Sequence, residues 1–212
     1  MITIPVPTIP VVDNPRDGGR GWVAATRGLN QRPWFYSCVS FGITIPEVAI
    51  RDRMIPLYGF NSGAEGYLFW GLNYHNRFRR SSGGQSWDGY RTERGVRSLM
   101  GDGTLIYPIP DASYLSTGSK LMYCPSTRLK MFRAGMEDYE FLNHLRRLYE
   151  RHKARLSDDE RAQIERLLNL DTLLFYSAWE HPDLINQRRG EVGNWITRLG
   201  TAAAPAAATR ER

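Results

Sequence analysis

The residues best suited to chemistry in this sequence are aromatic and amide side chains that follow a predicted strand. Trp70, Asn73 and Tyr74 lie at the end of the apolar run 66–72 or just beyond it. An indole can stack on a sugar ring, and an amide can bond two hydroxyls or an acetamido group. In α/β barrels, binding sites form at the carboxyl ends of the strands. If this strand belongs to such a fold, these residues predict one wall of a carbohydrate subsite. The competing interpretation is that Trp70 fills the interior of the fold.

Three further residues are candidates for the same subsite. Tyr36 lies late in the run 34–39, where it could point into the site or pack in the core. Trp87 and Asp88 belong to the long predicted loop 73–101, and loops of this length are usually functional or disordered. An indole in such a loop is hard to explain as core, and a carboxylate beside it could contact a sugar hydroxyl.

No pair of acids suited to cutting a glycosidic bond is predicted. Most glycosidases use two carboxyl groups roughly 5–10 Å apart, one of them with a raised pKa. Glu65 precedes its strand, which predicts a position at the end of the fold away from chemistry. Glu137 and Asp138 fall within a predicted helix, where pairing with Arg128 or Arg133 is the expected role.

Composition limits the other function classes. The chain of 212 residues has 28 Lys and Arg against 22 Asp and Glu, a net charge of +6 that could attract nucleic acid. Acidic residues interrupt the arginine runs, which favours a mixed solvated surface, and no nucleic-acid recognition motif is present. We expect no nucleic acid or membrane partner, because no apolar run reaches the roughly 18 residues of a membrane span. The four His and two Cys show no metal-ligand spacing, and no Gly-rich phosphate loop follows a strand, so we expect no metal or cofactor.

Four apolar runs are typical of buried strands, and amphipathic segments separate or follow them. The predicted strands are residues 2–6, 34–39, 66–72 and 104–107. Apolar residues at helical spacing predict a short helix near 22–26, one over 50–58 that Pro56 should kink or shorten before residues 61–63 end it, and a strong one over 129–145. A capping box at Ser157–Glu160 and a proline at 182 predict two more helix starts.

This order of elements predicts an α/β fold. Buried strands alternating with helices imply right-handed crossovers and a parallel sheet. Four such strands are half of an eight-stranded (β/α)8 TIM barrel, which predicts its C-terminal half over residues 1–200 and a disordered Ala/Pro tail over 201–212. A small open α/β sheet is the competing geometry.

Three segments in order carry a resemblance to a known family. They are AEGYLFWGLNY at 64–74, GDGTLIYP at 101–108 and STRLKMFRAGMEDYEFL at 126–142. This series resembles the C-terminal part of the glycoside hydrolase family 123 type catalytic domain, with residues 34–36 as its aromatic strand and 182–188 as its closing helix. Lys130 stands where that family commonly has Glu, and Ile109 where Gly commonly follows Tyr-Pro.

The resemblance implies a retaining, substrate-assisted reaction on N-acetylgalactosamine-type glycosides. In that family an adjacent Asp-Glu pair, upstream of all three segments, orients the acetamido group and protonates the leaving oxygen. Before residue 64 this sequence has no Asp followed by Glu. The resemblance therefore predicts a glycosidase fragment with no catalytic residue of its own, inactive alone, that could pair with a separately encoded N-terminal half barrel. The alternative is a non-catalytic carbohydrate-binding or scaffold protein.

Overall fold

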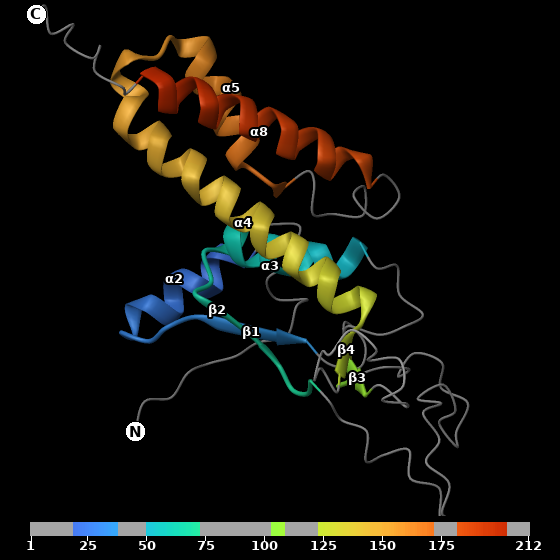
Figure 1. Cartoon of the computed structure of the whole chain (residues 1–212). Helices are drawn as coiled ribbons and strands as arrows, with labels where there is room; N and C mark the ends of the chain where they lie inside the picture. Colours follow the sequence, from blue (N-terminus) through green and yellow to red (C-terminus); the bar gives the residue numbers. More distant parts are fainter. Residues whose placement is uncertain (1–18, 38–49, 73–102, 109–122, 172–181, 203–212) are drawn as a thin grey trace, which may run out of the picture. The chain divides into compact units, whose positions relative to one another are not determined.

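The computed structural model describes residues 19–37, 50–72, 103–108, 123–171 and 182–202 (Figure 1). Over these residues the chain is a mixed α/β protein, mostly helical with a few short strands. It divides into two compact units, residues 1–135 and 136–212. The predicted strand 2–6 and the loop 73–101 lie outside the described residues, as does the predicted tail beyond residue 202.

The first unit holds every described strand. Its elements are α2 (Arg20–Gly28), β1 (Trp34–Ser37), α3 (Ile50–Ser62), β2 (Gly66–Phe69), β3 (Ile106–Pro108), β4 (Tyr123–Pro125) and the start of α4 (Thr127–His152). The second unit holds the rest of α4, the 3-10 turn η4 (Lys153–Arg155), α5 (Asp158–Leu168) and α8 (Asp183–Ala202). Every helix predicted from apolar spacing or capping is present.

Strands β1 and β2 form the parallel pair that the sequence predicts, with α3 between them along the chain (Figure 1). The register sets Trp34 opposite Gly66 and Tyr36 opposite Leu68. The carboxyl ends of both strands therefore lie at the same edge of the pair. This β1–α3–β2 succession is the arrangement expected of an α/β fold.

The described residues do not form the predicted row of four parallel strands. The run predicted at 104–107 becomes β3, and it pairs antiparallel with β4, a strand that was not predicted. The described strands thus make two sheets of two strands each. A three-residue strand such as Tyr123–Pro125 has too few residues for its periodicity to be recognised, and an apolar run does not reveal the direction of its partner.

Helix α3 continues through Pro56 to Ser62, so this proline does not shorten the helix, and the alternative that it kinks the helix stays a prediction. A proline in a helix interior removes one hydrogen bond and crowds the preceding turn. Nearly every residue of α3 is buried, and this packing outweighs the local cost. The predicted stop is confirmed, because Gly63 follows the helix with a φ of 78° and donates its N–H to the carbonyl of Gly59 at 2.9 Å.

Within the first unit, α4 approaches α3 closely at Gly135. A Cβ atom at this position would overlap the carbonyl oxygen of Arg53 and would stand 3.0 Å from Cδ of Pro56. Only a residue without a side chain allows this approach of two helix backbones. The glycine in the segment 126–142 therefore has a packing reason that spacing alone does not show.

The second unit is built on apolar stripes of α4, α5 and α8. Its buried core includes Leu142, Leu145, Leu148, Ile164, Leu167, Leu170, Ile185, Val192 and Leu199. Arg188 of α8 donates to the carbonyls of Leu167 and Asn169 at 3.1 and 2.7 Å, and so satisfies acceptors at the end of α5. This arginine fastens one helix to the terminus of another.

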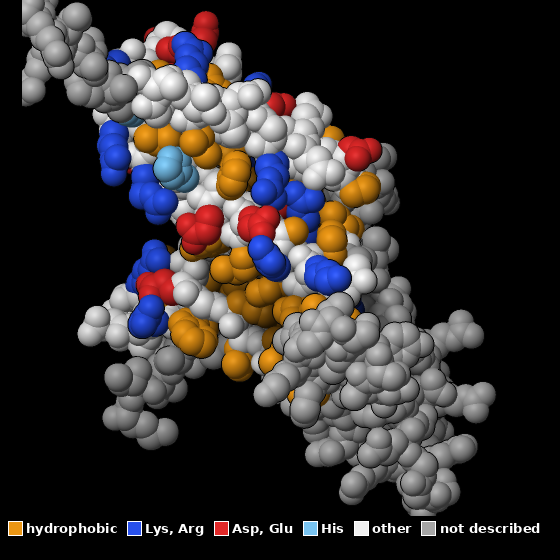
Figure 2. Space-filling view, viewed as in Figure 1, with side chains coloured by type: hydrophobic (Ala, Val, Ile, Leu, Met, Phe, Trp, Pro, Cys, Tyr) orange, Lys and Arg blue, Asp and Glu red, His pale blue; other side chains and the backbone are white. Residues whose placement is uncertain are grey.

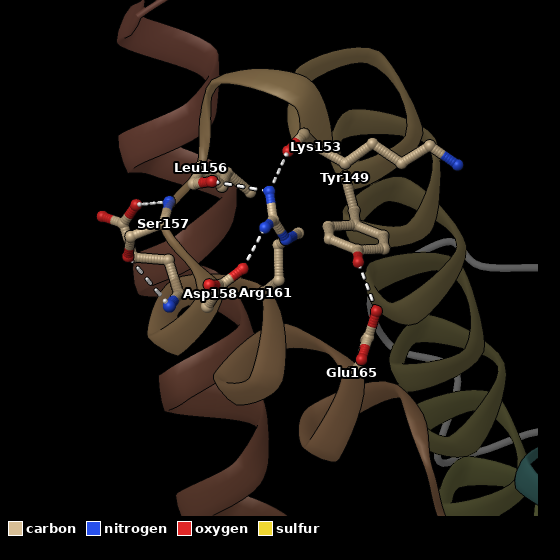
Figure 3. Close-up of polar contacts among 8 residues, drawn as sticks. Tyr149, Lys153, Leu156, Ser157, Asp158, Arg161 and Glu165 are labelled. Atoms are coloured by element: carbon tan, nitrogen blue, oxygen red, sulfur yellow. Dashed lines mark hydrogen bonds and ion pairs between the residues drawn. The ribbon is translucent and has the colours of Figure 1, made fainter.

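The predicted capping box at the start of α5 is confirmed (Figure 3). The hydroxyl of Ser157 accepts from the N–H of Glu160, and the Glu160 carboxylate accepts from the N–H of Ser157 at 2.9 Å. This backbone hydrogen bond from Ser157 lowers the pKa of Glu160. Arg161 adds a second tie, since it donates to the carbonyl of Leu156 and pairs with Asp158.

We expect Ser157→Ala to destabilise the second unit by about 1 kcal/mol, because the first turn of α5 loses a hydrogen-bond acceptor. Urea denaturation followed by far-UV circular dichroism measures the change. Thr201→Ala at the end of α8 is the control, since its hydroxyl bonds only carbonyls of its own helix among the hydrogen bonds found for it. Equal stabilities for the two variants would contradict the cap.

The surface carries both signs of charge close together, as the interleaved sequence predicts. On the face shown in Figure 2, basic and acidic side chains of the described residues lie interspersed. Ion pairs contribute to this pattern, among them Arg189 with Asp138 and Lys153 with Glu150. None of the described helices is long and apolar enough to cross a membrane.

Candidate carbohydrate-binding site

The two faces of the β1–β2 pair have different surroundings. On one face Phe35 is 1% exposed and lies against Gly59 of α3, and its ring centroid is 5.1 Å from that of Tyr67. Tyr67 in turn lies 5.5 Å from Phe132 of α4. These rings form a helix-covered aromatic core. Because side chains alternate along a strand, Trp34, Tyr36 and Leu68 must project from the other face.

This second face is aromatic and partly open. The indole of Trp34 lies across Gly66, where a Cβ atom would come within 2.5 Å of the ring. Tyr36 is half-buried, and Leu68, its partner in the register, is 45% exposed. Leu72, beyond the end of β2, is 50% exposed. Leu68 and Leu72 thus leave apolar surface exposed at and beyond the carboxyl end of β2.

Trp70 stands at the carboxyl end of this face. It directly follows β2, is 40% exposed, and its ring centroid is 6.5 Å from that of Phe69. Its six-membered ring lies over the backbone of Gly103. An indole that is supported by backbone on one side and keeps much of its surface in solvent has the geometry of a stacking platform.

Two of the six predicted site residues, Trp70 and Tyr36, fall within the described residues. They belong to the same edge of the β1–β2 pair, at the carboxyl ends of its strands. The other four candidates, Asn73, Tyr74, Trp87 and Asp88, lie outside the described residues. Trp34 was not among the predicted site residues, although its position two residues before Tyr36 signals that it shares the same face.

The acid nearest to this sheet in sequence has an ion-pairing role. Glu65 accepts from Arg32 at 2.8 Å and lies 3.6 Å from Arg27, before the first residue of β2. The hydrogen bond from Arg32 holds the pKa of Glu65 below its ordinary value. A general acid needs a raised pKa, so Glu65 is unsuited to that task. Glu65 also precedes β2, whereas Trp70 follows it, so the two residues belong to opposite ends of the strand.

Glu137 and Asp138 also form ion pairs, but with a partner that the sequence did not indicate. Arg189 of α8 donates to Asp138 at 2.9 Å and lies 3.5 Å from Glu137. Asp138 is 5% exposed. The pairing with Arg128 or Arg133 stays a prediction from neighbours in sequence, and Arg189 adds a partner from more than 50 residues away along the chain.

Arg128 has a different task in the first unit. It is 5% exposed and donates to the carbonyl oxygen of Thr104 at 2.5 Å and to the hydroxyl of Tyr107 at 2.8 Å. The first turn of α4 is thereby tied to the chain just after Gly103. Among the described residues, no group of three or more His, Cys, Asp or Glu side chains could hold a metal ion.

Comparison with known families agrees with this arrangement. The family model of the glycoside hydrolase 123 catalytic domain matches residues 9–145, which include both strands of the parallel pair and most of α4. The chain belongs to this family, and it is a glycoside hydrolase-like protein. The match ends within α4, so α5 and α8 lie beyond it. The search of curated proteins found no match.

Proposed function

We propose that this chain supplies the sugar-binding wall of a glycoside hydrolase-like domain, with the Trp70 indole as its stacking platform. The carrying observation is the 40% exposed ring at the carboxyl end of β2, on an α/β scaffold of this family. Tyr36 forms the neighbouring part of the wall. In the proposed site Asn73, Tyr74, Trp87 and Asp88 contribute polar and aromatic contacts from the segment that follows.

The proposed substrates are N-acetylgalactosamine-type glycosides, which the family cleaves by a retaining, substrate-assisted route. In that route the acetamido oxygen attacks the anomeric carbon, and a carboxylic acid protonates the leaving oxygen. Glu65, the acid that we place nearest to the wall, has a lowered pKa and is unsuited to that protonation. We therefore propose that the chain binds sugar but does not cleave glycosides alone.

The proposed partner is a half barrel that provides strands 1–4 and the acid pair, with this chain as the C-terminal half of a TIM barrel. Parallel strands of such a barrel are covered on both faces, whereas Leu68 and Leu72 are 45% and 50% exposed here. A partner sheet or segment over this face would bury them.

A non-catalytic carbohydrate-binding protein is the second candidate, supported by the same exposed aromatic face without an acid pair.

Binding of N-acetylgalactosamine to the purified chain, measured by calorimetry, tests the proposed wall. We expect Trp70→Ala to weaken binding by about fivefold to thirtyfold, since loss of a stacking ring costs on the order of 1–2 kcal/mol. Leu29→Ala is the control, because Leu29 is 71% exposed and lies at the end of α2. Unchanged affinity in Trp70→Ala would refute the stacking role.

Hydrolysis of an aryl N-acetylgalactosaminide separates the two candidates. We expect no hydrolysis by the purified chain, and activity would overturn the proposal that it is inactive alone. If an N-terminal half barrel of the family, produced separately, restores hydrolysis on mixing, the chain is one half of a glycosidase. If sugar binds but mixing restores nothing, the non-catalytic candidate is supported.

A further inference from the structure

Gly103 lies against the Trp70 indole, and Gly71 lies against Gly103. Gly103 has a φ of 75°, and a Cβ atom on it would come within 2.5 and 2.6 Å of two carbon atoms of the indole's six-membered ring. A Cβ atom on Gly71 would come within 2.8 Å of the Cα and carbonyl oxygen of Gly103. Neither approach leaves room for a side chain, so Gly103 packs closely against both the ring and Gly71.

The stack rests on a fixed frame. The N–H groups of Leu105 and Ile106 donate to the carbonyl oxygen of Leu72 at 2.7 and 3.2 Å, which ties the chain after Gly103 to the chain after Gly71. The buried Arg128 holds the carbonyl of Thr104, the residue next to Gly103, at 2.5 Å. Gly103 is therefore anchored through the residues that directly follow it, and it can act as a rigid seat.

We infer that Gly71 and Gly103 are positioning residues for the Trp70 platform, setting the angle at which the indole meets a sugar ring. The inference rests on the proposed function, because it identifies the two glycines that orient the Trp70 ring proposed there to stack on sugar. A site must be held to within about half an ångström to keep its contacts, and a methyl group inserted under the ring exceeds that tolerance. A side chain at either glycine tilts the indole and weakens sugar binding while the fold persists.

Nuclear magnetic resonance of the full chain tests this directly. The chain has 6 Trp, so a ¹⁵N-labelled sample gives a small set of indole N–H peaks, and Trp70→Phe identifies the peak of Trp70 by its loss. We expect Gly103→Ala to move the Trp70 peak and to weaken N-acetylgalactosamine binding about tenfold, an effect of ~1.4 kcal/mol. The other indole peaks should stay in place.

Gly63→Ala is the matched control. Gly63 has nearly the same backbone angle, a φ of 78°, so alanine there carries the same backbone strain. Its added Cβ atom would meet only Val23 and Arg27, at 3.8 and 3.9 Å. We expect this variant to leave both the Trp70 peak and the sugar affinity unchanged. Gly103→Asn is a second variant in case alanine prevents folding, since Asn tolerates positive φ but keeps the Cβ atom.

The outcomes distinguish the inference from the function on which it rests. A Trp70 peak that stays in place in Gly103→Ala and Gly103→Asn, or that moves equally in Gly63→Ala, overturns the positioning role. If N-acetylgalactosamine leaves the Trp70 peak of the wild-type chain unmoved while Gly103→Ala still shifts it, the glycines seat the ring but the ring is no sugar platform. That result overturns the proposed function together with the sugar-binding part of the inference.

Discussion

Gly135→Ala is expected to destabilise the chain by about 3 kcal/mol or more, or to prevent folding altogether. The new methyl group would overlap the carbonyl oxygen of Arg53 and crowd Cδ of Pro56, which itself lies inside α3. Overpacking a well-filled interior typically costs about 1–3 kcal/mol, and the obstacle here is helix backbone that cannot rotate away. The gain of about 1 kcal/mol that alanine brings to a helix interior is too small to compensate.

The same substitution in α8 provides the control. Gly190 and Gly200 are helical, and an added Cβ atom at either would meet no heavy atom within 4 Å. Gly200→Ala should therefore be neutral or stabilise the chain by up to about 1 kcal/mol through helix propensity. Urea denaturation monitored by circular dichroism, together with soluble yield, measures both variants. A Gly135→Ala protein as stable as Gly200→Ala would contradict the close approach of α3 and α4.

The second large effect is expected for Arg128→Met, which should cost about 2–4 kcal/mol. Methionine approximates the length of the arginine stem but has no N–H to donate to the carbonyl of Thr104. Thr104 is only 3% exposed, so this hydrogen bond lies in a buried environment. Hydrogen bonds from charged donors contribute about 1.5–3 kcal/mol, and a buried acceptor left unsatisfied adds its desolvation cost. Tyr107 loses a partner in the same step.

Arg147→Met, on the exposed side of the same helix, is the control for removing one positive charge from α4. It should change stability by less than about 0.5 kcal/mol, as surface substitutions usually do. Arg128→Lys should recover part of the loss, because an ammonium keeps the charge and the N–H donors but ends one atom short of the Nη2 atom that makes both contacts. Equal unfolding midpoints in urea for Arg128→Met and Arg147→Met would show that the contact with Thr104 contributes little.

Helix starts and stops were predictable because their causes are local. The Ser157–Glu160 capping box needs only residues within one turn, and it forms as predicted. Gly63 ends α3 because it alone among nearby residues adopts a positive φ without a steric cost. The apolar runs at 34–39 and 66–72 likewise predicted β1 and β2, since strands covered by helices lose their polar alternation.

Contacts between distant segments were not predictable in this way. Arg189 pairs with Asp138 from a distant helix, and β4 pairs antiparallel with a strand expected to join a parallel row. The site shows the same difference. The position of Trp70 at the end of its strand was predicted, with filling of the interior as the alternative, whereas its contact with Gly103 joins two segments more than 30 residues apart. The spacing of residues along the chain does not reveal which distant segments come into contact.

By itself the sequence determined the family, the helices, the parallel pair of strands and the aromatic residue at the end of β2. Each of these depends on residue type and short-range order, which a sequence states directly. Only the tertiary structure decided that Gly135, Gly71 and Gly103 allow backbone or ring to approach, and which arginine neutralises which acid. These features depend on the free space and charge around a residue, and that environment is created when distant parts of the chain pack together.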